Sequence, residues 1–123
     1  MKAGTWNTNC PGIKTPKEFV GFVYIITEKK TNKMYIGCKK FWTKKGKPTN
    51  WKTYVSSSGS LKGFDINNPK LFKKDIIYVA ESITKMKAYE AYMQLQFYWN
   101  GKWDQLYNEM VNLRVRIRKA KKE

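Results

Sequence analysis

Two short apolar segments separated by a polar turn constrain this chain more than any other feature of its sequence. Phe22–Thr27 and Lys33–Gly37 are rich in β-branched and aromatic residues, and the five residues between them are polar. This pattern is typical of an antiparallel hairpin whose turn is longer than the two-residue type, so the turn conformation stays open. Each segment carries one tyrosine, Tyr24 and Tyr35, and Gly37 lets the backbone turn sharply or lets a ligand come close. Two phenols beside the lysines that follow Gly37 could hold a phosphate and move a proton.

The net charge is the strongest compositional feature. The 123 residues include 25 lysines and arginines against 9 aspartates and glutamates, a formal net charge of +16. Such an imbalance destabilises the free fold, and a polyanionic partner is the simplest reason to tolerate it. Nucleic acid is favoured over a membrane surface, because no apolar run approaches the roughly 20 residues of a spanning helix. The polar N-terminus has no signal-peptide core, so an intracellular, cytoplasmic location is expected.

The chain contains no histidine, and this restricts its chemistry. Nucleophilic catalysis by Ser/His or Cys/His pairs is excluded, as are most zinc sites. Its two cysteines, Cys10 and Cys38, are far apart in the sequence, and a reduced protein is expected rather than a disulfide. Any catalysis must therefore use Tyr, Lys, Arg, Glu or Asp.

The whole pattern predicts an α+β fold: a small three-stranded mixed sheet with an N-terminal hairpin, flanked by helices. We expect a single domain over residues 1–123, with an arm at 1–18 and a basic tail at 112–123. The predicted strands are Phe19–Thr27, Lys33–Gly37 and Asp75–Ala80. The predicted helices are a short one from the Asn68 cap to about Lys74, a long one over Thr84–Trp99 capped by Ser82 or Thr84, and a last one from Asp104 to about Val111.

Basic and aromatic residues gather in two places that nucleic acid could contact. Between Cys38 and Gly63, lysines alternate with aromatic residues, a surface on which phosphates could pair and bases could stack. A solvated lysine-rich loop anchored by buried aromatics is the alternative. The candidate nucleic-acid contacts are Lys33, Lys40, Trp51, Tyr54, Asn108, Arg114, Arg116 and Arg118.

The long helix carries one carboxylate in a narrow polar strip. Met86, Tyr89, Met93 and Phe97 form an apolar stripe at helical spacing, and Glu90 lies at its edge beside Lys87 and Gln94. A solvent-facing glutamate is one interpretation. A metal ligand at the edge of a cleft is the other.

Several residues together resemble the signature of the GIY-YIG nuclease superfamily. Phe22-Val23-Tyr24 is followed after ten residues by Tyr35-Ile36-Gly37, with Phe and Val in place of the first Gly and Ile. Glu90 resembles the family's metal-binding glutamate, and Leu106-Tyr107-Asn108 is similar to the segment that holds its asparagine near the end of the catalytic module. The segment Trp51–Ser57 is similar to a variant found in phage-type members, so a phage-encoded, homing-endonuclease-like domain is implied.

The resemblance implies a Mg²⁺-dependent (or Mn²⁺-dependent) endonuclease that hydrolyses phosphodiester bonds of DNA. Tyr24 would be the general base, Tyr35 would orient the water or phosphate, and Glu90 would hold a single metal ion. The family's arginine after the glycine is missing, since no arginine precedes Arg114. Lys39 and Lys52 are the candidates to replace it, although lysine cannot form arginine's bidentate fork to a phosphate.

The partners and the biological role are less constrained by the sequence. We expect DNA as the partner, no membrane, no small-molecule cofactor, and a monomer or weak homodimer. DNA against RNA, and homing, restriction or repair roles, all stay open. A catalytically inactive nucleic-acid-binding protein on the same scaffold is the alternative function, and the missing arginine favours it.

Overall fold

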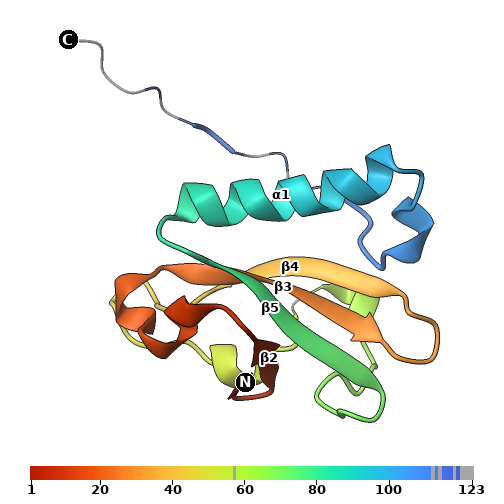
Figure 1. Ribbon diagram of the computed structural model, residues 1–123, viewed down its shortest axis with the longest axis horizontal. Helices are drawn as coiled ribbons and strands as arrows, with labels where there is room; N and C mark the ends of the chain where they lie inside the picture. Colours follow the sequence, from red (N-terminus) through yellow and green to blue (C-terminus); the bar gives the residue numbers. More distant parts are fainter. Residues whose placement is uncertain (57, 112, 114, 118, 120–123) are drawn as a thin grey trace.

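The chain folds into one mixed β-sheet with a helix across one of its faces (Figure 1). The computed structural model describes residues 1–56, 58–111, 113, 115–117 and 119. In these residues the strands are β1 (Lys2–Ala3), β2 (Trp6–Thr8), β3 (Gly21–Glu28), β4 (Met34–Lys40) and β5 (Phe72–Ala80), and the α-helix is α1 (Ile83–Trp99). Short 3₁₀ helices lie at Pro11–Lys14, Pro16–Glu18, Trp51–Thr53, Gly59–Leu61 and Trp103–Gln105.

The predicted α+β class is confirmed, but the prediction of three strands is wrong. The sheet has five strands in the order β1-β2-β5-β3-β4. The two additional strands come from the expected N-terminal arm: β2 runs parallel to β5, and β1 pairs antiparallel with β2. Trp6 on β2 is fully buried, so this segment contributes to the core as well as to the sheet.

Strand β3 is the centre of the sheet, and it forms the predicted hairpin with β4. It pairs antiparallel with both β4 and β5. The hairpin turn includes Asn32 at a φ of 59°, a left-handed conformation that asparagine tolerates better than most residues. The sequence therefore located this hairpin, and the structure adds the turn geometry.

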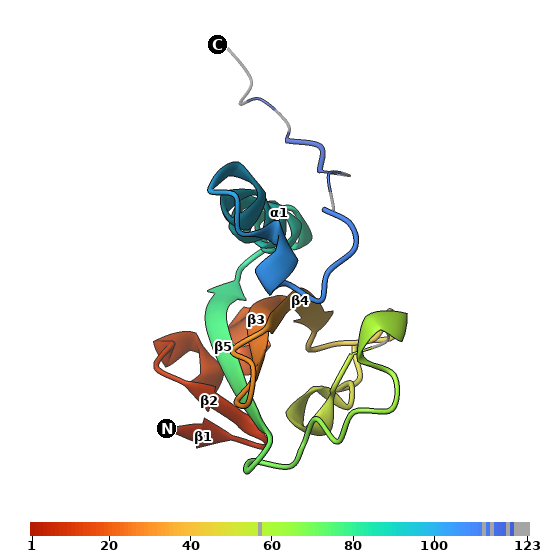
Figure 2. The same ribbon diagram turned by 90° about the vertical axis from the view of Figure 1, so that its right-hand side faces the viewer.

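Alternation along β3 divides the core into two layers. Phe22, Tyr24 and Ile26 point to one face, where they meet Trp6 and Trp51. On the other face, the fully buried side chains include Val23 of β3, Ile36 of β4, Ala80 of β5 and Met86 of α1. Figure 2 shows α1 on one side of the sheet.

A β-bulge lies beside Tyr24. Val23 pairs with Tyr78 of β5 while Tyr24 pairs with Ile76, so Ile77 is the extra residue. A bulge raises the local twist and re-aims the neighbouring side chains, and bulges are frequent next to active sites. This irregularity lies near the middle of β3, beside the position where Tyr24 pairs with Gly37 of β4.

Two predicted helices are absent from the described part of the chain. Residues 67–71 form turns rather than a helix, because β5 begins at Phe72 and pairs with Glu28 of β3. The helix expected over 104–111 shrinks to the 3₁₀ turn Trp103–Gln105. After that turn the backbone is extended along β4, where Tyr107 N donates to Met34 O (2.6 Å). Unpaired backbone groups at the β4 edge outcompete the weak helical preference of this segment.

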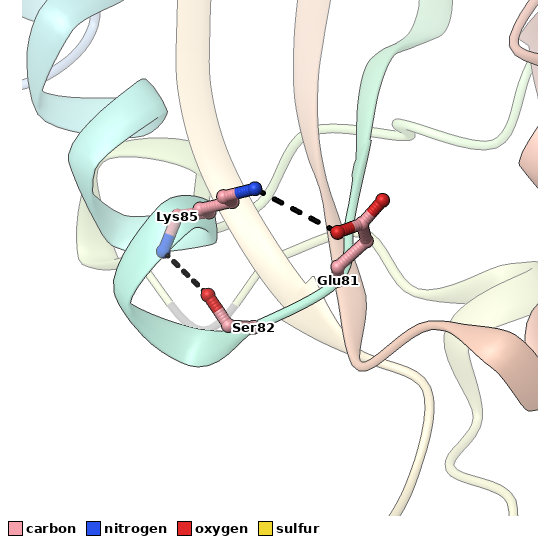
Figure 3. A network of polar contacts seen from close by, with 3 residues as sticks. All are labelled: Glu81, Ser82 and Lys85. Carbon is pink, nitrogen blue, oxygen red and sulfur yellow. Dashed lines mark hydrogen bonds and ion pairs between the residues drawn. The ribbon is translucent and has the colours of Figure 1, made fainter.

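The long helix matches its prediction closely. The Ser82 hydroxyl caps it by accepting a hydrogen bond from Lys85 N (3.1 Å), and the Lys85 ammonium lies 3.6 Å from the Glu81 carboxylate (Figure 3). At the other end, Gly101 adopts a φ of +71°, the left-handed conformation that commonly follows a helix. Serine, rather than Thr84, is therefore the cap.

We expect Ser82→Ala to lower the free energy of unfolding by about 1 kcal/mol, because the variant leaves the Lys85 N–H without its side-chain acceptor. Denaturant unfolding followed by circular dichroism measures this change. Ser82→Asp keeps an acceptor oxygen and is the matched control, expected to unfold as the wild type does. Equal losses in both variants would contradict the capping role.

Candidate functional site

The two tyrosines of the hairpin meet across Gly37. Tyr24 of β3 lies directly opposite Gly37 of β4, and their neighbours Ile26 and Tyr35 form the next pair on that face. A Cβ placed on Gly37 would lie 2.5 Å from the Tyr24 hydroxyl and 3.0 Å from the Tyr35 ring. The two ring centroids are 6.3 Å apart. Glycine is needed here because the phenol of Tyr24 occupies the space of its missing side chain.

Tyr24 is a buried phenol, with 2% of its surface exposed. Burial raises its pKa well above the ordinary value of 10, and the nearby phenols of Tyr35 and Tyr54 raise it further, while a hydrogen bond with Ser56 acts in the opposite direction. A role for Tyr24 as general base would need positive charge nearby to lower this pKa. The local environment in the structure acts the other way.

Glu90 faces the sheet rather than solvent. Its side chain is 8% exposed, and Gln94, one turn later, is 3% exposed. Glu90 accepts a hydrogen bond from Cys38 of β4, and burial together with this carboxylate raises the pKa of the Cys38 thiol to about 12. The solvent-facing interpretation of Glu90 is therefore wrong. The polar strip of α1 packs against β4, and Tyr92 and Trp99 are exposed on the same helix.

Side-chain amides bind the backbone between Tyr35 and Gly37. Asn108 Oδ1 accepts from Ile36 N (2.9 Å), and Asn108 Nδ2 donates to Ile36 O (2.7 Å). Gln94 Nε2 donates to the same carbonyl (3.1 Å). Asn108 is 7% exposed, so a direct contact between this amide and nucleic acid would require breaking both bonds. The placement makes Asn108 a positioning group for the edge strand.

A pocket of about 470 Å³ opens beside this edge strand. Tyr35 and Glu90 both line it, and they reach it from opposite faces of β4. Glu109 and the loop Ser58-Gly59-Ser60 contribute the other polar groups, with Gln94 and Asn108 at the wall. Glu109, which follows Asn108 directly, was not among the site residues predicted from the sequence. Gln94, one helical turn after Glu90, was predicted only as part of the polar strip of the long helix.

The two candidate lysines occupy different environments. Lys39 Nζ lies 4.2 Å from the centroid of Tyr54, whose ring packs edge-on against Tyr24 at 6.2 Å. Lys52 Nζ lies 5.8 Å from the Trp51 ring, and its backbone carbonyl accepts from Thr5 in the β1–β2 turn (2.8 Å). Lys39 is thus linked through Tyr54 to the tyrosine pair, whereas the contacts described for Lys52 lead away from it.

The other predicted nucleic-acid contacts are spread over the molecule. Trp51 is buried in the core, Tyr54 is half-buried, and Lys40 and Arg116 are exposed. Lys33 Nζ lies over the Tyr107 ring at 4.6 Å. Arg114 and Arg118 lie outside the described residues. Of the six that the structure describes, Trp51 and Asn108 are buried, so these six do not form one exposed surface.

The donor groups at the pocket suit a hard cation. Carboxylate and hydroxyl oxygens, here from Glu90, Glu109 and the serine loop, are the ligands that Mg²⁺ prefers. Within the described residues, no group of three or more His, Cys, Asp or Glu side chains could hold a metal ion. A metal here would therefore keep most of its ligands as waters and phosphate oxygens, in the manner usual for Mg²⁺.

The structure thus has a small α+β fold in which two tyrosines of the central hairpin lie across a glycine and α1 contributes a carboxylate to the neighbouring pocket. The family model described as "Putative endonuclease segE, GIY-YIG domain" matches residues 6–101 of the chain. The chain belongs to this family, which confirms the resemblance and indicates nuclease activity with DNA as substrate. No curated protein and no solved structure matches the chain significantly. The matched range begins at Trp6 and ends at Gly101, so it includes Glu90 but not Asn108.

Of the helices that the structure describes, none combines the length and the apolar character needed to cross a bilayer.

We expect Gly37→Ala to displace the Tyr24 phenol and to lower the free energy of unfolding by about 1–3 kcal/mol, the usual cost of overpacking. Chemical denaturation measures the loss, and near-UV circular dichroism reports the tyrosine environment. Gly59→Ala is the matched control, because a Cβ there meets nothing within 4 Å. A Gly37→Ala protein as stable as Gly59→Ala would contradict the described packing.

Proposed function

We propose that this protein is a Mg²⁺- or Mn²⁺-dependent DNA endonuclease that hydrolyses phosphodiester bonds at the pocket between β4 and α1. The observation that carries the proposal is the convergence of Tyr35 and Glu90 on one pocket from opposite faces of the edge strand. A proton-accepting phenol and a carboxylate beside open space are what metal-assisted hydrolysis needs when no histidine is available.

The two tyrosines have different roles in this proposal. Tyr35 lines the pocket, so its hydroxyl takes the position next to the attacking water. Tyr24 is buried with a raised pKa, so its neutral phenol supports Tyr35 and the Gly37 backbone. This assignment exchanges the roles that the sequence suggested, in which Tyr24 was the base and Tyr35 the orienting group.

Lys39 is the better candidate for the missing arginine. It lies on the same face of β4 as Tyr35 and Gly37, because side chains alternate along a strand. Its ammonium would stabilise the charge that grows on the phosphate in the transition state. Lys52 belongs to the region around Trp51 and the β1–β2 turn.

Glu90 would hold the divalent cation, with Glu109 and the serine loop close enough to the pocket to orient its waters. When bound, such a cation supplies Lewis-acid polarisation of a phosphate oxygen and lowers the pKa of its water. The hydrogen bond from Cys38 and the packing of α1 on β4 orient the Glu90 carboxylate. As a monomer or weak homodimer, the protein would break a duplex by two sequential nicks or by pairing two copies.

The decisive test compares Glu90→Gln with the wild type. We expect the variant to bind labelled duplex DNA as the wild type does and to lose about 100-fold or more of Mg²⁺-dependent plasmid nicking, because it removes the charge that holds the cation. EDTA should abolish nicking by the wild type. Glu81→Gln is the matched control: Glu81 is exposed at the start of α1 and should cut normally. Normal cutting by Glu90→Gln would refute the metal assignment.

Tyrosine substitutions test the assignment of the two phenols. We expect Tyr35→Phe to lower the single-turnover cleavage rate by about 10²-fold or more, the usual contribution of a general base. Tyr24→Phe should lower the rate by about tenfold, through displacement of Tyr35. The rates are measured with saturating protein on a labelled duplex. If Tyr24→Phe is the more severe variant, Tyr24 is the base, as the sequence suggested.

A nucleic-acid-binding protein without catalytic activity is the second candidate. The observation that favours it is the lining of the pocket, where the described residues include no lysine or arginine. This second function predicts DNA binding that weakens steeply with salt, and no strand scission at any Mg²⁺ or Mn²⁺ concentration.

A further inference from the structure

A second cavity, of about 410 Å³, lies near the opposite edge of the sheet. The β1–β2 turn, the start of β5 and the turn at 66–69 enclose it. Four lysines line it: Lys2, Lys29, Lys73 and Lys74. The described lining residues include no aspartate or glutamate, and Thr5, Asn7 and Asn67 are its other polar side chains.

Lys74 is the most unusual residue of this cavity, because its charged side chain is only 3% exposed. Its ammonium donates to three neutral acceptors: the Thr5 hydroxyl (2.5 Å), the Tyr54 carbonyl (2.7 Å) and Asn67 Oδ1 (2.7 Å). The Trp6 ring lies 4.1 Å away, in a cation–π contact. All three donors are therefore satisfied by partners that carry no formal negative charge.

A buried ammonium with only neutral partners keeps an uncompensated positive charge. The three hydrogen bonds and the Trp6 ring offset part of the cost of burying this charge, but none of these partners neutralises it. Desolvation, and then the charge of Lys2, lowers the pKa of Lys74 to about 8. An anion in the cavity would offset the repulsion from Lys2 and stabilise the charged form of Lys74, so the cavity favours negative charge.

The remaining lysines are placed to contact such an anion directly. Lys29 Nζ donates to the Pro69 carbonyl (2.5 Å), which leaves two of its three N–H donors for a ligand. Lys73 lies 3.6 Å from Asp75, but its side chain is 58% exposed, and an exposed ion pair of this kind contributes little energy. Lys2 is exposed at the cavity edge.

We propose that this cavity binds a phosphate group of the nucleic-acid backbone, at a position distant from the phosphodiester that is cleaved. The choice of nucleic acid as the source of the phosphate rests on the proposed function. Lys2, Lys29 and Lys73 make the contacts, and Lys74 supplies a fixed charge behind them.

The dimensions of the sheet set the distance between the two sites. The cleavage pocket lies at β4 and the lysine cavity at β1, β2 and β5, so up to four strand spacings separate them. At roughly 4.8 Å per spacing this is about 19 Å, or roughly six nucleotides of one strand at 3.4 Å each. A contact so far from the reacting atoms strengthens binding without changing the chemical step, so it should affect KM and leave kcat unchanged.

The test compares Lys73→Gln with Lys85→Gln. Both lysines are exposed to nearly the same extent (58% and 61%), and each lies 3.6 Å from one carboxylate, so the two variants lose the same charge and a similar ion pair. Lys85 belongs to the network at the start of α1 (Figure 3), outside both cavities. Fluorescence anisotropy with a labelled duplex, in EDTA and at 50–200 mM NaCl, measures the affinity and its salt dependence.

We expect Lys73→Gln to weaken DNA binding about three- to tenfold and to lower the salt slope by about one relative to Lys85→Gln. Lys2→Gln should behave as Lys73→Gln does. Titration with inorganic phosphate, followed by ¹H–¹⁵N NMR, shows whether the cavity binds a free phosphate ion. Comparison with the DNA-binding data then distinguishes free phosphate from the phosphates of the nucleic-acid backbone. If phosphate shifts the amides of Thr5 and Asn67 but Lys73→Gln binds DNA as Lys85→Gln does, the nucleic-acid assignment is overturned. If neither effect is seen, the site itself is overturned.

Cleavage assays separate this inference from the proposed function. At saturating DNA, Lys73→Gln should cut at the wild-type rate with a raised KM. If the wild type cuts no DNA but its binding still depends on Lys73, the proposed function fails and the phosphate site stands. If the wild type cuts DNA and Lys73→Gln has the KM of Lys85→Gln, the phosphate site fails and the proposed function stands.

Discussion

The packing of Tyr24 across Gly37 is the constraint on which this site depends. The phenol needs the space of a missing Cβ, and a bulge in β5 lies directly beside it. Its ring is 4.9 Å from Trp6, and Trp6 brings β2 onto β5. The space left by Gly37 therefore allows Tyr24 to pack between Tyr35, which lines the pocket, and Trp6 of the aromatic core. Trp6 in turn belongs to β2, one of the N-terminal strands.

The second constraint is the unpaired edge of β4. An edge strand must have its backbone groups satisfied or covered. Here the segment after α1 does so with a mixture of backbone and side-chain bonds: Tyr107 N to Met34, and the Asn108 amide to both groups of Ile36. The Tyr107 hydroxyl also donates to Glu28 at the base of the hairpin turn (2.9 Å). Because Tyr35 lies between these anchors, its backbone is held on both sides.

The sequence located the hairpin, the third long strand and the long helix because their periodicity and end signals are local. It missed β1 and β2, since two- and three-residue strands have no measurable period and form only through pairing with β5. It also misjudged α1. Apolar residues nearly surround this helix, so the pattern could not show that Glu90 and Gln94 face β4 while Trp99, 84% exposed, faces solvent. The burial of Lys74 could not be predicted from the sequence either, because its hydrogen-bond partners are the distant residues 5, 54 and 67.

The distribution of charge supports the proposal that a cation binds at the pocket beside β4. Although the chain carries +16 overall, the described residues lining that pocket include two carboxylates and no lysine or arginine. The distant cavity has the reverse composition, with four lysines and no carboxylate among its described lining residues. A phosphodiester entering the first pocket would be repelled by Glu90 and Glu109 unless a divalent cation neutralised them. Lysines elsewhere on the surface would then hold the polyanion, and the carboxylates would make the reacting position depend on the metal.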